Sequence, residues 1–320
     1  MSLNVSFQDV LKAKKRLQGR VIETPLVYSG ILSEEIGTDV WFKMESLQKT
    51  GSFKVRGALN KLDTLNDEER VKGVITASAG NHAQGLAYAS SLKNISAKIV
   101  VPVTTPGTKK HGILRYGGEL IVHGANYDEA EAYAHQLAAE TERVFVNAFE
   151  DDHIIAGQGT AALEAFLAEP DFDAVVVPAG GGGLLCGVAL VAKAINPDIK
   201  VIGVQTDASP PWYYAFKARK LVPVEYKDSL AEGLHGGISQ ANLDLALKIV
   251  DEIILVEEES VAREMHWMAA EHHYIVEGSG VVGIAAFHDG LLDDLKGKKV
   301  LTFVTGSNLD FNKLLEISVE

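Results

Sequence analysis

The sequence has almost no cysteine, little positive charge and no long apolar run. Cys186 is the only cysteine in 320 residues, so the chain can form no internal disulfide and a reducing compartment is expected. The formal net charge of -13 argues against an electrostatic grip on nucleic acid or an anionic membrane. No stretch approaches the ~18 apolar residues of a membrane-spanning helix, and the N-terminus lacks the pattern of a secretory signal. These absences predict a cytoplasmic protein with neither nucleic acid nor membrane as a partner.

Apolar β-branched runs recur along the chain with helix-length segments between most of them. A first helix is expected from about Ser6, which forms a capping-box pattern with Asp9. The runs that predict strands lie at residues 74–76, 99–101, 120–122, 144–146, 175–177, 201–204, 253–256 and 300–304. Such alternation is typical of parallel sheets with helices on both faces. Two intertwined α/β domains fit this pattern best, and one closed barrel is the alternative.

Four consecutive glycines, Gly180 to Gly183, directly follow the run at 175–177 and precede Leu184. Glycines place no Cβ in the way, so successive N–H groups can point at one anion. A helix start adds its dipole to these donors. The position between a predicted strand and a predicted helix favours a phosphate site over a flexible linker.

Two further glycine patterns, at residues 278–283 and 157–162, match the type that binds dinucleotides. Neither follows a predicted strand in the first strand-to-helix turn of a βαβ unit. A nicotinamide or flavin oxidoreductase is an alternative carried by these two patterns alone.

Three more segments place reactive side chains at predicted helix starts and strand ends. Lys54 stands at a helix start, where a cation is electrostatically unfavourable, and this makes it a candidate Schiff-base lysine as well as a candidate solvated one. The segment 78–82, Ser-Ala-Gly-Asn-His, offers a hydroxyl, an amide and N–H groups that suit a carboxylate. The segment 305–308, Thr-Gly-Ser-Asn, follows the last predicted strand with further hydroxyls.

Together these segments resemble the fold-type II pyridoxal-phosphate (PLP) enzymes, and within them the threonine/serine dehydratase and serine racemase branch. The resemblance extends over almost the whole chain. It rests on residues 51–54, 78–82, 156–160, 180–183, 277–278 and 305–308, in that order. It implies an α/β fold of two open, mostly parallel twisted sheets flanked by helices, like the tryptophan synthase β subunit. Residues 1–48 plus 146–320 would form the large PLP-binding domain, and residues 49–145 the small domain that carries Lys54 and the 78–82 loop.

The resemblance also implies roles for individual residues. Lys54 would hold pyridoxal 5′-phosphate as a Schiff base and shuttle the Cα proton of the substrate. The other cofactor contacts would be Phe53, Asn81, Gly180, Gly181, Gly182, Gly183, Leu184 and Thr305. The substrate carboxylate would lie against Ser78, Ala79, Gly80, Asn81 and His82. Because the hydroxyl of Thr305 would face the pyridine nitrogen, the ring would stay neutral and favour prompt elimination.

The implied activity is a β-elimination that converts L-threonine, L-serine or both to a 2-oxo acid and ammonia in a homodimer or homotetramer. Alternatives are a dehydratase of another hydroxy amino acid such as 3-hydroxyaspartate, a serine racemase, or a PLP-binding protein without turnover. Relatives that racemise carry a serine where Ala79 stands. Gln205 replaces a glutamate that helps many relatives hold a divalent cation, so no metal of that type is expected. With the last motif at 305–308, no C-terminal regulatory domain is expected. His235 is a candidate for either a substrate contact or a structural role.

Overall fold

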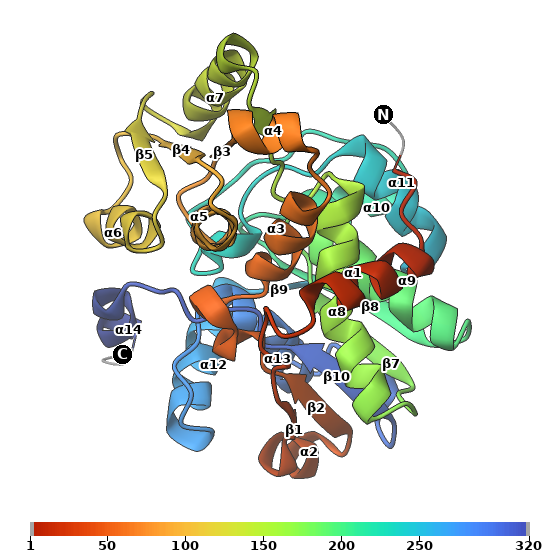
Figure 1. Cartoon of the computed structure of the whole chain (residues 1–320). Coiled ribbons are helices and arrows are strands. Elements are labelled where there is room, and N and C mark those ends of the chain that lie inside the picture. Colours follow the sequence, from red (N-terminus) through yellow and green to blue (C-terminus); the bar gives the residue numbers. More distant parts are fainter. Residues whose placement is uncertain (1–2, 318–320) are drawn as a thin grey trace.

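The computed structural model of the chain describes residues 3–317, which fold around two separate β-sheets (Figure 1). Across the larger sheet the strands are β1 (Leu26–Tyr28), β2 (Asp39–Lys43), β10 (Lys299–Phe303), β7 (Ala174–Pro178), β8 (Lys200–Thr206) and β9 (Glu252–Val256). Across the smaller sheet they are β5 (Glu119–Val122), β4 (Ala97–Val101), β3 (Val74–Ala77) and β6 (Val144–Phe145). All neighbouring strands are parallel except β1 and β2, which are antiparallel.

All eight predicted strands are confirmed, and they form two open sheets rather than one barrel. The sequence does not predict β1 and β2, because charged residues stand at both ends of β2. Lys43 is nevertheless buried, since its Nζ donates to Glu164 at 2.8 Å and to the Thr24 carbonyl at 2.7 Å. A buried ion pair thus stands where the pattern of a strand calls for an apolar side chain.

Helices connect the strands and cover both sheets. The α-helices are α1 (Phe7–Leu17), α2 (Gly30–Ile36), α3 (Lys54–Asp63), α4 (Asp67–Lys72), α5 (Asn81–Lys93), α6 (Gly107–Arg115), α7 (Tyr127–Thr141), α8 (Asp152–Ala168), α9 (Gly183–Ile195), α10 (Pro211–Ala218), α11 (Gln240–Ile249), α12 (Glu258–Glu271), α13 (Val282–His288) and α14 (Phe311–Ile317). Short 3₁₀ helices are η1 (Glu45–Leu47), η2 (Lys49–Gly51), η3 (Glu232–Leu234), η4 (Gly278–Gly280) and η5 (Asp293–Leu295). The predicted cap of α1 is confirmed, because Ser6 N donates to Asp9 at 3.1 Å.

The inner strands β3, β4 and β7 are mostly apolar because both of their faces are covered. In β7, Val175 and Val177 face a core shared with α8 and α9, whereas Val176 faces a second core with α12 and α13. In β4 of the smaller sheet, Ile99 packs with α3 and α5, and its neighbour Val100 packs under α7. Continuous apolar runs are the expected sequence of such doubly covered parallel strands.

The glycine pattern at 157–162 lies inside α8, where it serves helix packing. A Cβ on Gly157 would lie 2.6 Å from the Cα of Gly57 in α3, and one on Gly159 would lie 2.8 Å from the Gly187 carbonyl in α9. The pattern at 278–283 spans η4 and the start of α13. Neither has the strand-to-helix setting of a dinucleotide loop.

No helix within residues 3–317 combines the length and the apolar character needed to cross a bilayer. The smaller sheet draws all its strands from residues 74–145. This agrees with the predicted small domain in its strands, while the domain bounds themselves stay a prediction.

Candidate active site

The loops after β3, β7 and β10 carry three of the predicted segments, at residues 78–82, 180–183 and 305–308. In open α/β sheets, ligands bind beyond the carboxyl ends of strands. Backbone pairing joins the last of these loops to the lysine segment, because Phe53 N donates to the Thr305 carbonyl at 3.3 Å. The amide of Asn308 donates to Asn81 Oδ1 at 2.8 Å and so joins the same loop to the segment after β3.

Lys54 is the first residue of α3, and its side chain is half-buried at this site. Its Nζ donates to the Ala148 carbonyl at 3.1 Å and lies 5.3 Å from the centre of the Phe53 ring. Burial lowers the pKa of Lys54 to about 8, against the opposing attraction of Glu277. Roughly a tenth of the amine is therefore neutral at pH 7, and the neutral amine is the form that attacks a carbonyl.

The segment next to Ala148 connects the lysine to the tetraglycine. A Cβ on Gly181 would lie 2.1 Å from the ring of Phe149. Asn242 fixes the same contact, since its amide donates to the carbonyls of Gly181 at 2.7 Å and Phe149 at 3.3 Å. Phe149 and Asn242 carry no sequence signal that marks them as site residues.

The tetraglycine leaves a row of backbone donors at the start of α9. Gly182, at the N-cap, has a φ of 102°, and a Cβ there would lie 2.5 Å from Trp212. Within residues 3–317, the N–H groups of Gly180–Gly183 donate to no backbone acceptor. Free N–H groups at a helix N-terminus form an anion site, and this placement fits a phosphate.

The segment 78–82 begins α5 at Asn81. Ser78 Oγ accepts from Gly80 N at 3.3 Å, which turns the hydroxyl toward the first N–H groups of the helix. The His82 side chain points into the protein, where Nε2 lies 3.1 Å from the Val146 carbonyl. Burial lowers the pKa of His82 to about 3, with a smaller contribution from Lys54, so the imidazole is neutral.

Glu277 is a charged neighbour of the site. It belongs to the segment 277–278 that supports the resemblance, but the resemblance implies no individual role for it. Its Oε1 accepts from the Asn81 amide at 2.7 Å, and a Cβ on Gly306 would lie 2.4 Å from the same oxygen. Burial raises the pKa of Glu277 to about 7, although the hydrogen bond from Asn81 favours the ionised form. A carboxyl group whose pKa lies near neutrality, and which is close enough to raise the pKa of Lys54, has the properties of a proton-exchanging group.

The remaining predicted residues lie as follows. Leu184 is buried in the first turn of α9, and the Thr305 backbone pairs with the Phe53 segment. Gln205 accepts hydrogen bonds from Trp212 N at 2.8 Å and Tyr213 N at 3.3 Å, which ties its amide to α10. His235 is exposed, with Nε2 at 3.2 Å from the Lys227 carbonyl.

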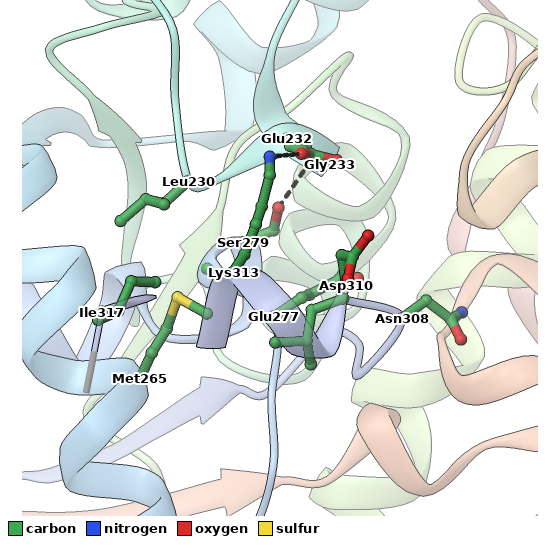
Figure 2. Close-up of a pocket in the computed structure, with 12 residues that line it drawn as sticks. Leu230, Glu232, Gly233, Met265, Glu277, Ser279, Asn308, Asp310, Lys313 and Ile317 are labelled. Carbon is green, nitrogen blue, oxygen red and sulfur yellow. Dashed lines mark hydrogen bonds and ion pairs between the residues drawn. The ribbon is translucent and has the colours of Figure 1, made fainter. Parts of the chain in front are cut away.

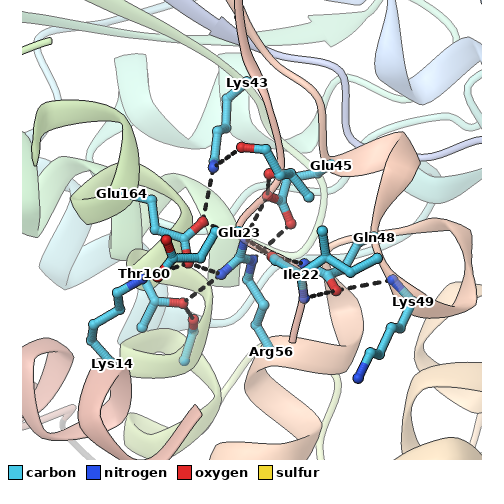
Figure 3. A network of polar contacts seen from close by, with 12 residues as sticks. Lys14, Ile22, Glu23, Lys43, Glu45, Gln48, Lys49, Arg56, Thr160 and Glu164 are labelled. Atoms are coloured by element: carbon cyan, nitrogen blue, oxygen red, sulfur yellow. Dashed lines mark hydrogen bonds and ion pairs between the residues drawn. The ribbon is translucent and has the colours of Figure 1, made fainter. Parts of the chain in front are cut away.

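A buried ionic network holds the first turn of α3 (Figure 3). The Arg56 guanidinium is fully buried and pairs with both oxygens of Glu45 and both oxygens of Glu164, each at 2.8 Å. Ser46, next to Glu45, donates from N to the Val304 carbonyl at 2.8 Å. The network therefore links the helix that begins with Lys54 to the end of β10, just before Thr305.

Residues 17–306 match the family described as "Pyridoxal-phosphate dependent enzyme". The chain belongs to this family, and the predicted fold, family and cofactor are confirmed. It is 42% identical over 311 residues to the L-threonine ammonia-lyase of Thermotoga maritima, covering 97% of this chain and 77% of that relative. It is 35% identical over 318 residues to the catabolic L-threonine dehydratase of Escherichia coli K12, covering 99% and 97%.

Solved structures of similar chains have the same fold. Maize serine racemase superposes with a TM-score of 0.93 at 32% identity, covering 98% of this chain and 96% of that one. The processed form of threonine deaminase isoform 2 from Solanum lycopersicum gives 0.92 at 32% identity, covering 99% and 96%. Because a racemase and a deaminase fit equally well, the fold alone does not choose between these activities.

Proposed function

We propose that this chain is a carbon–nitrogen lyase that removes water and ammonia from L-threonine, L-serine or both. The observation that carries the proposal is the match over nearly the whole chain, at 35–42% identity, to relatives named L-threonine ammonia-lyase or dehydratase. The arrangement of Lys54, the tetraglycine and the 78–82 loop supports the proposal, because it offers an amine, N–H donors for a phosphate and donors for a substrate carboxylate.

The residues present fit pyridoxal 5′-phosphate. Lys54 offers a partly neutral amine, and Gly180–Gly183 with Leu184 offer unpaired N–H groups for the phosphate. Phe53 would pack beside the ring, Asn81 would contact its 3-oxygen, and Thr305 would lie at its nitrogen. When bound, the cofactor supplies an electron sink for the electron pair of the broken Cα–H bond.

The chain's own groups would then position the substrate and move its protons. The N–H groups of residues 79–82 and the Ser78 hydroxyl would bind the carboxylate at the start of α5. Lys54 Nζ would take the Cα proton. The Cβ–O bond breaks as hydroxide leaves with a proton, and one water later returns to hydrolyse the released imine. The sum is L-threonine to 2-oxobutanoate and ammonia, or L-serine to pyruvate and ammonia.

Ala79 supports a lyase over a racemase. Racemisation needs an acid on the face of the planar carbon opposite Lys54, and the Ala79 methyl has no proton to donate. Lys54 with its lowered pKa supports turnover over a binding protein that has lost its activity.

Three wider features belong to the same proposal. The chain acts as a homodimer or homotetramer in the cytoplasm, in keeping with its acidic composition and its one cysteine, which is buried. It is built from a large domain of residues 1–48 plus 146–320 and a small domain of residues 49–145.

The test is an assay of the purified holoenzyme with a panel of hydroxy amino acids, in which ammonia and the 2-oxo acid are both measured. We expect equal amounts of the two products from L-threonine, L-serine or both. Production of neither from either substrate by cofactor-loaded protein would overturn the proposal.

A further inference from the structure

Glu232 joins three separate parts of the molecule. It is the first residue of η3, in a loop of the larger-sheet region. Its Oε2 accepts from Lys109 on α6, which flanks the smaller sheet, and its Oε1 accepts from Lys313 on α14. Figure 1 shows α6 and α14 as neighbours on the same side of the molecule, and Figure 2 shows the Lys313–Glu232 pair. One carboxylate thus holds two ammonium groups.

This ionic group lies beside the candidate active site. Glu232 and Lys313 line a pocket that we call the outer pocket, together with Glu277, Asn308 and Asp310 (Figure 2). Asn308 and Glu277 are bonded to Asn81 in the proposed carboxylate loop. On its other side, the backbone of Gly233 packs against the tetraglycine, since a Cβ on Gly180 would lie 2.9 Å from the Gly233 carbonyl.

The charges around the outer pocket are unfavourable for an acidic ligand. Among the described residues that line it, Lys313 is the only cation, and Glu277 and Asp310 are acidic. Lys109 lies close enough to favour ionisation of Glu277, and Glu232 opposes it. Both lysines are turned toward Glu232, and their two positive charges are matched in this group by the carboxylates of Glu232 and Asp310. A substrate carboxylate at this end would meet acidic groups and no unpaired ammonium.

We propose that Glu232 is a specificity-determining residue that occupies Lys109 and Lys313 and so restricts the enzyme to hydroxy amino acids with uncharged side chains. The inference rests on the proposed lyase function and names its substrate class. Hydroxy amino acids that carry a second carboxylate, such as 3-hydroxyaspartate, are excluded by the lack of a free cation. Loss of the Glu232 charge releases two lysines, which then attract that carboxylate.

The experiment compares L-threonine with L-threo-3-hydroxyaspartate in the parent holoenzyme and in Glu232→Gln. Elimination from the second substrate would give oxaloacetate and ammonia, so the same ammonia assay serves both. We expect the ratio of kcat/KM for hydroxyaspartate to that for threonine to rise roughly fivefold or more in Glu232→Gln, as for a partly exposed ion pair. The ratio is the readout because a general disturbance of the loop would change kcat/KM for both substrates by a similar factor.

Two further variants identify the cause. Adding Lys109→Met and Lys313→Met to Glu232→Gln is expected to remove the gain, since no released ammonium remains. Glu68→Gln, which breaks an exposed pair with Lys72 on α4, is the matched control and is expected to leave the ratio as in the parent. A gain that survives loss of both lysines would overturn the inference.

Binding without turnover gives an independent readout. Calorimetry of the holoenzyme with succinate and with butyrate compares a four-carbon dicarboxylate with a monocarboxylate. We expect Glu232→Gln to bind succinate roughly fivefold more tightly than the parent does, and to bind butyrate with the same affinity as the parent. If the parent eliminates from threonine but neither ratio moves in Glu232→Gln, the inference is wrong and the proposed function stands. If the parent uses neither threonine nor serine, the proposed function fails, and the succinate comparison alone then decides the role of Glu232.

Discussion

Lys54 and Glu277 have pKa values displaced toward neutrality from opposite sides. Burial lowers the pKa of Lys54 to about 8 and raises that of Glu277 to about 7, because both charged forms lose contact with water. Each group then exists in both protonation states near pH 7. Such displaced pairs are typical of sites that move protons, and the sequence around Glu277 gives no hint of its displacement.

Glu277→Gln is expected to change how stability depends on pH. The folded-state pKa of Glu277 lies above its unfolded value, so the folded protein keeps a proton that the unfolded chain releases. The retained proton stabilises the folded protein. This stabilisation is fully present below about pH 4.5 and is lost as the pH rises through about 7. Relative to the Gln variant, the parent apoprotein should lose on the order of 2 kcal/mol of unfolding free energy between pH 4.5 and 7.5. Urea denaturation at several pH values measures this, and parallel curves for the two proteins would contradict it.

Ala79 predicts the stereochemical outcome of the serine reaction. Without a hydroxyl on the second face, the parent should convert L-serine to pyruvate with negligible D-serine. Chiral chromatography of the reaction measures this directly, with Ala79→Ser run beside it as the variant that restores the hydroxyl. Abundant D-serine from the parent would show that another group reaches that face and would make the chain a racemase.

At the scale of elements, the sequence predicts those strands and helices that have a recognisable local pattern of apolar residues. The runs that form β7 and β8 are buried on both faces, so their apolar character is continuous and easy to recognise. The pattern fails for β2, where Lys43 is buried by pairing with Glu164, a partner 121 residues away. It also fails for Phe149, whose role depends on its contact with Gly181 and on no feature of its own segment.

Gly181→Ala is expected to weaken PLP binding at least tenfold, because the new Cβ would displace Phe149 and disturb the row of N–H groups. Gly30→Ala is the matched control, since a Cβ there meets nothing nearer than 3.9 Å. Equilibrium dialysis of each apoprotein with PLP measures the affinity. Unchanged affinity in Gly181→Ala would remove the phosphate assignment.

Arg56→Met is expected to destabilise the apoprotein by about 3–5 kcal/mol, since it leaves Glu45 and Glu164 buried with much of their compensating charge removed. Arg20→Met breaks a pair with Asp63 in which the arginine is 45% exposed, and it should cost at most about 1 kcal/mol. Urea denaturation compares the two variants. Equal losses would mean that the buried network does not hold α3 in place.

At the scale of the whole molecule, the site is assembled by topology. Residues 54, 81, 148, 181, 277 and 305 come together although they span most of the chain. The order of motifs allows the fold and the family to be predicted from the sequence, because the segments 78–82, 180–183 and 305–308 each follow a recognisable strand. The ionic contacts of Glu232 could not be predicted, since they join α6, η3 and α14 through side chains without a local pattern.

The central claim is that Lys54 holds the cofactor of a PLP-dependent lyase. The most direct measurement is borohydride reduction of the purified holoenzyme, followed by digestion and mass spectrometry of the modified peptide. The account predicts that the visible absorbance band is bleached and that the pyridoxyl group is found on Lys54, with L-threonine turnover lost in the reduced protein. A pyridoxyl group on a different lysine, with Lys54 unmodified, would contradict it.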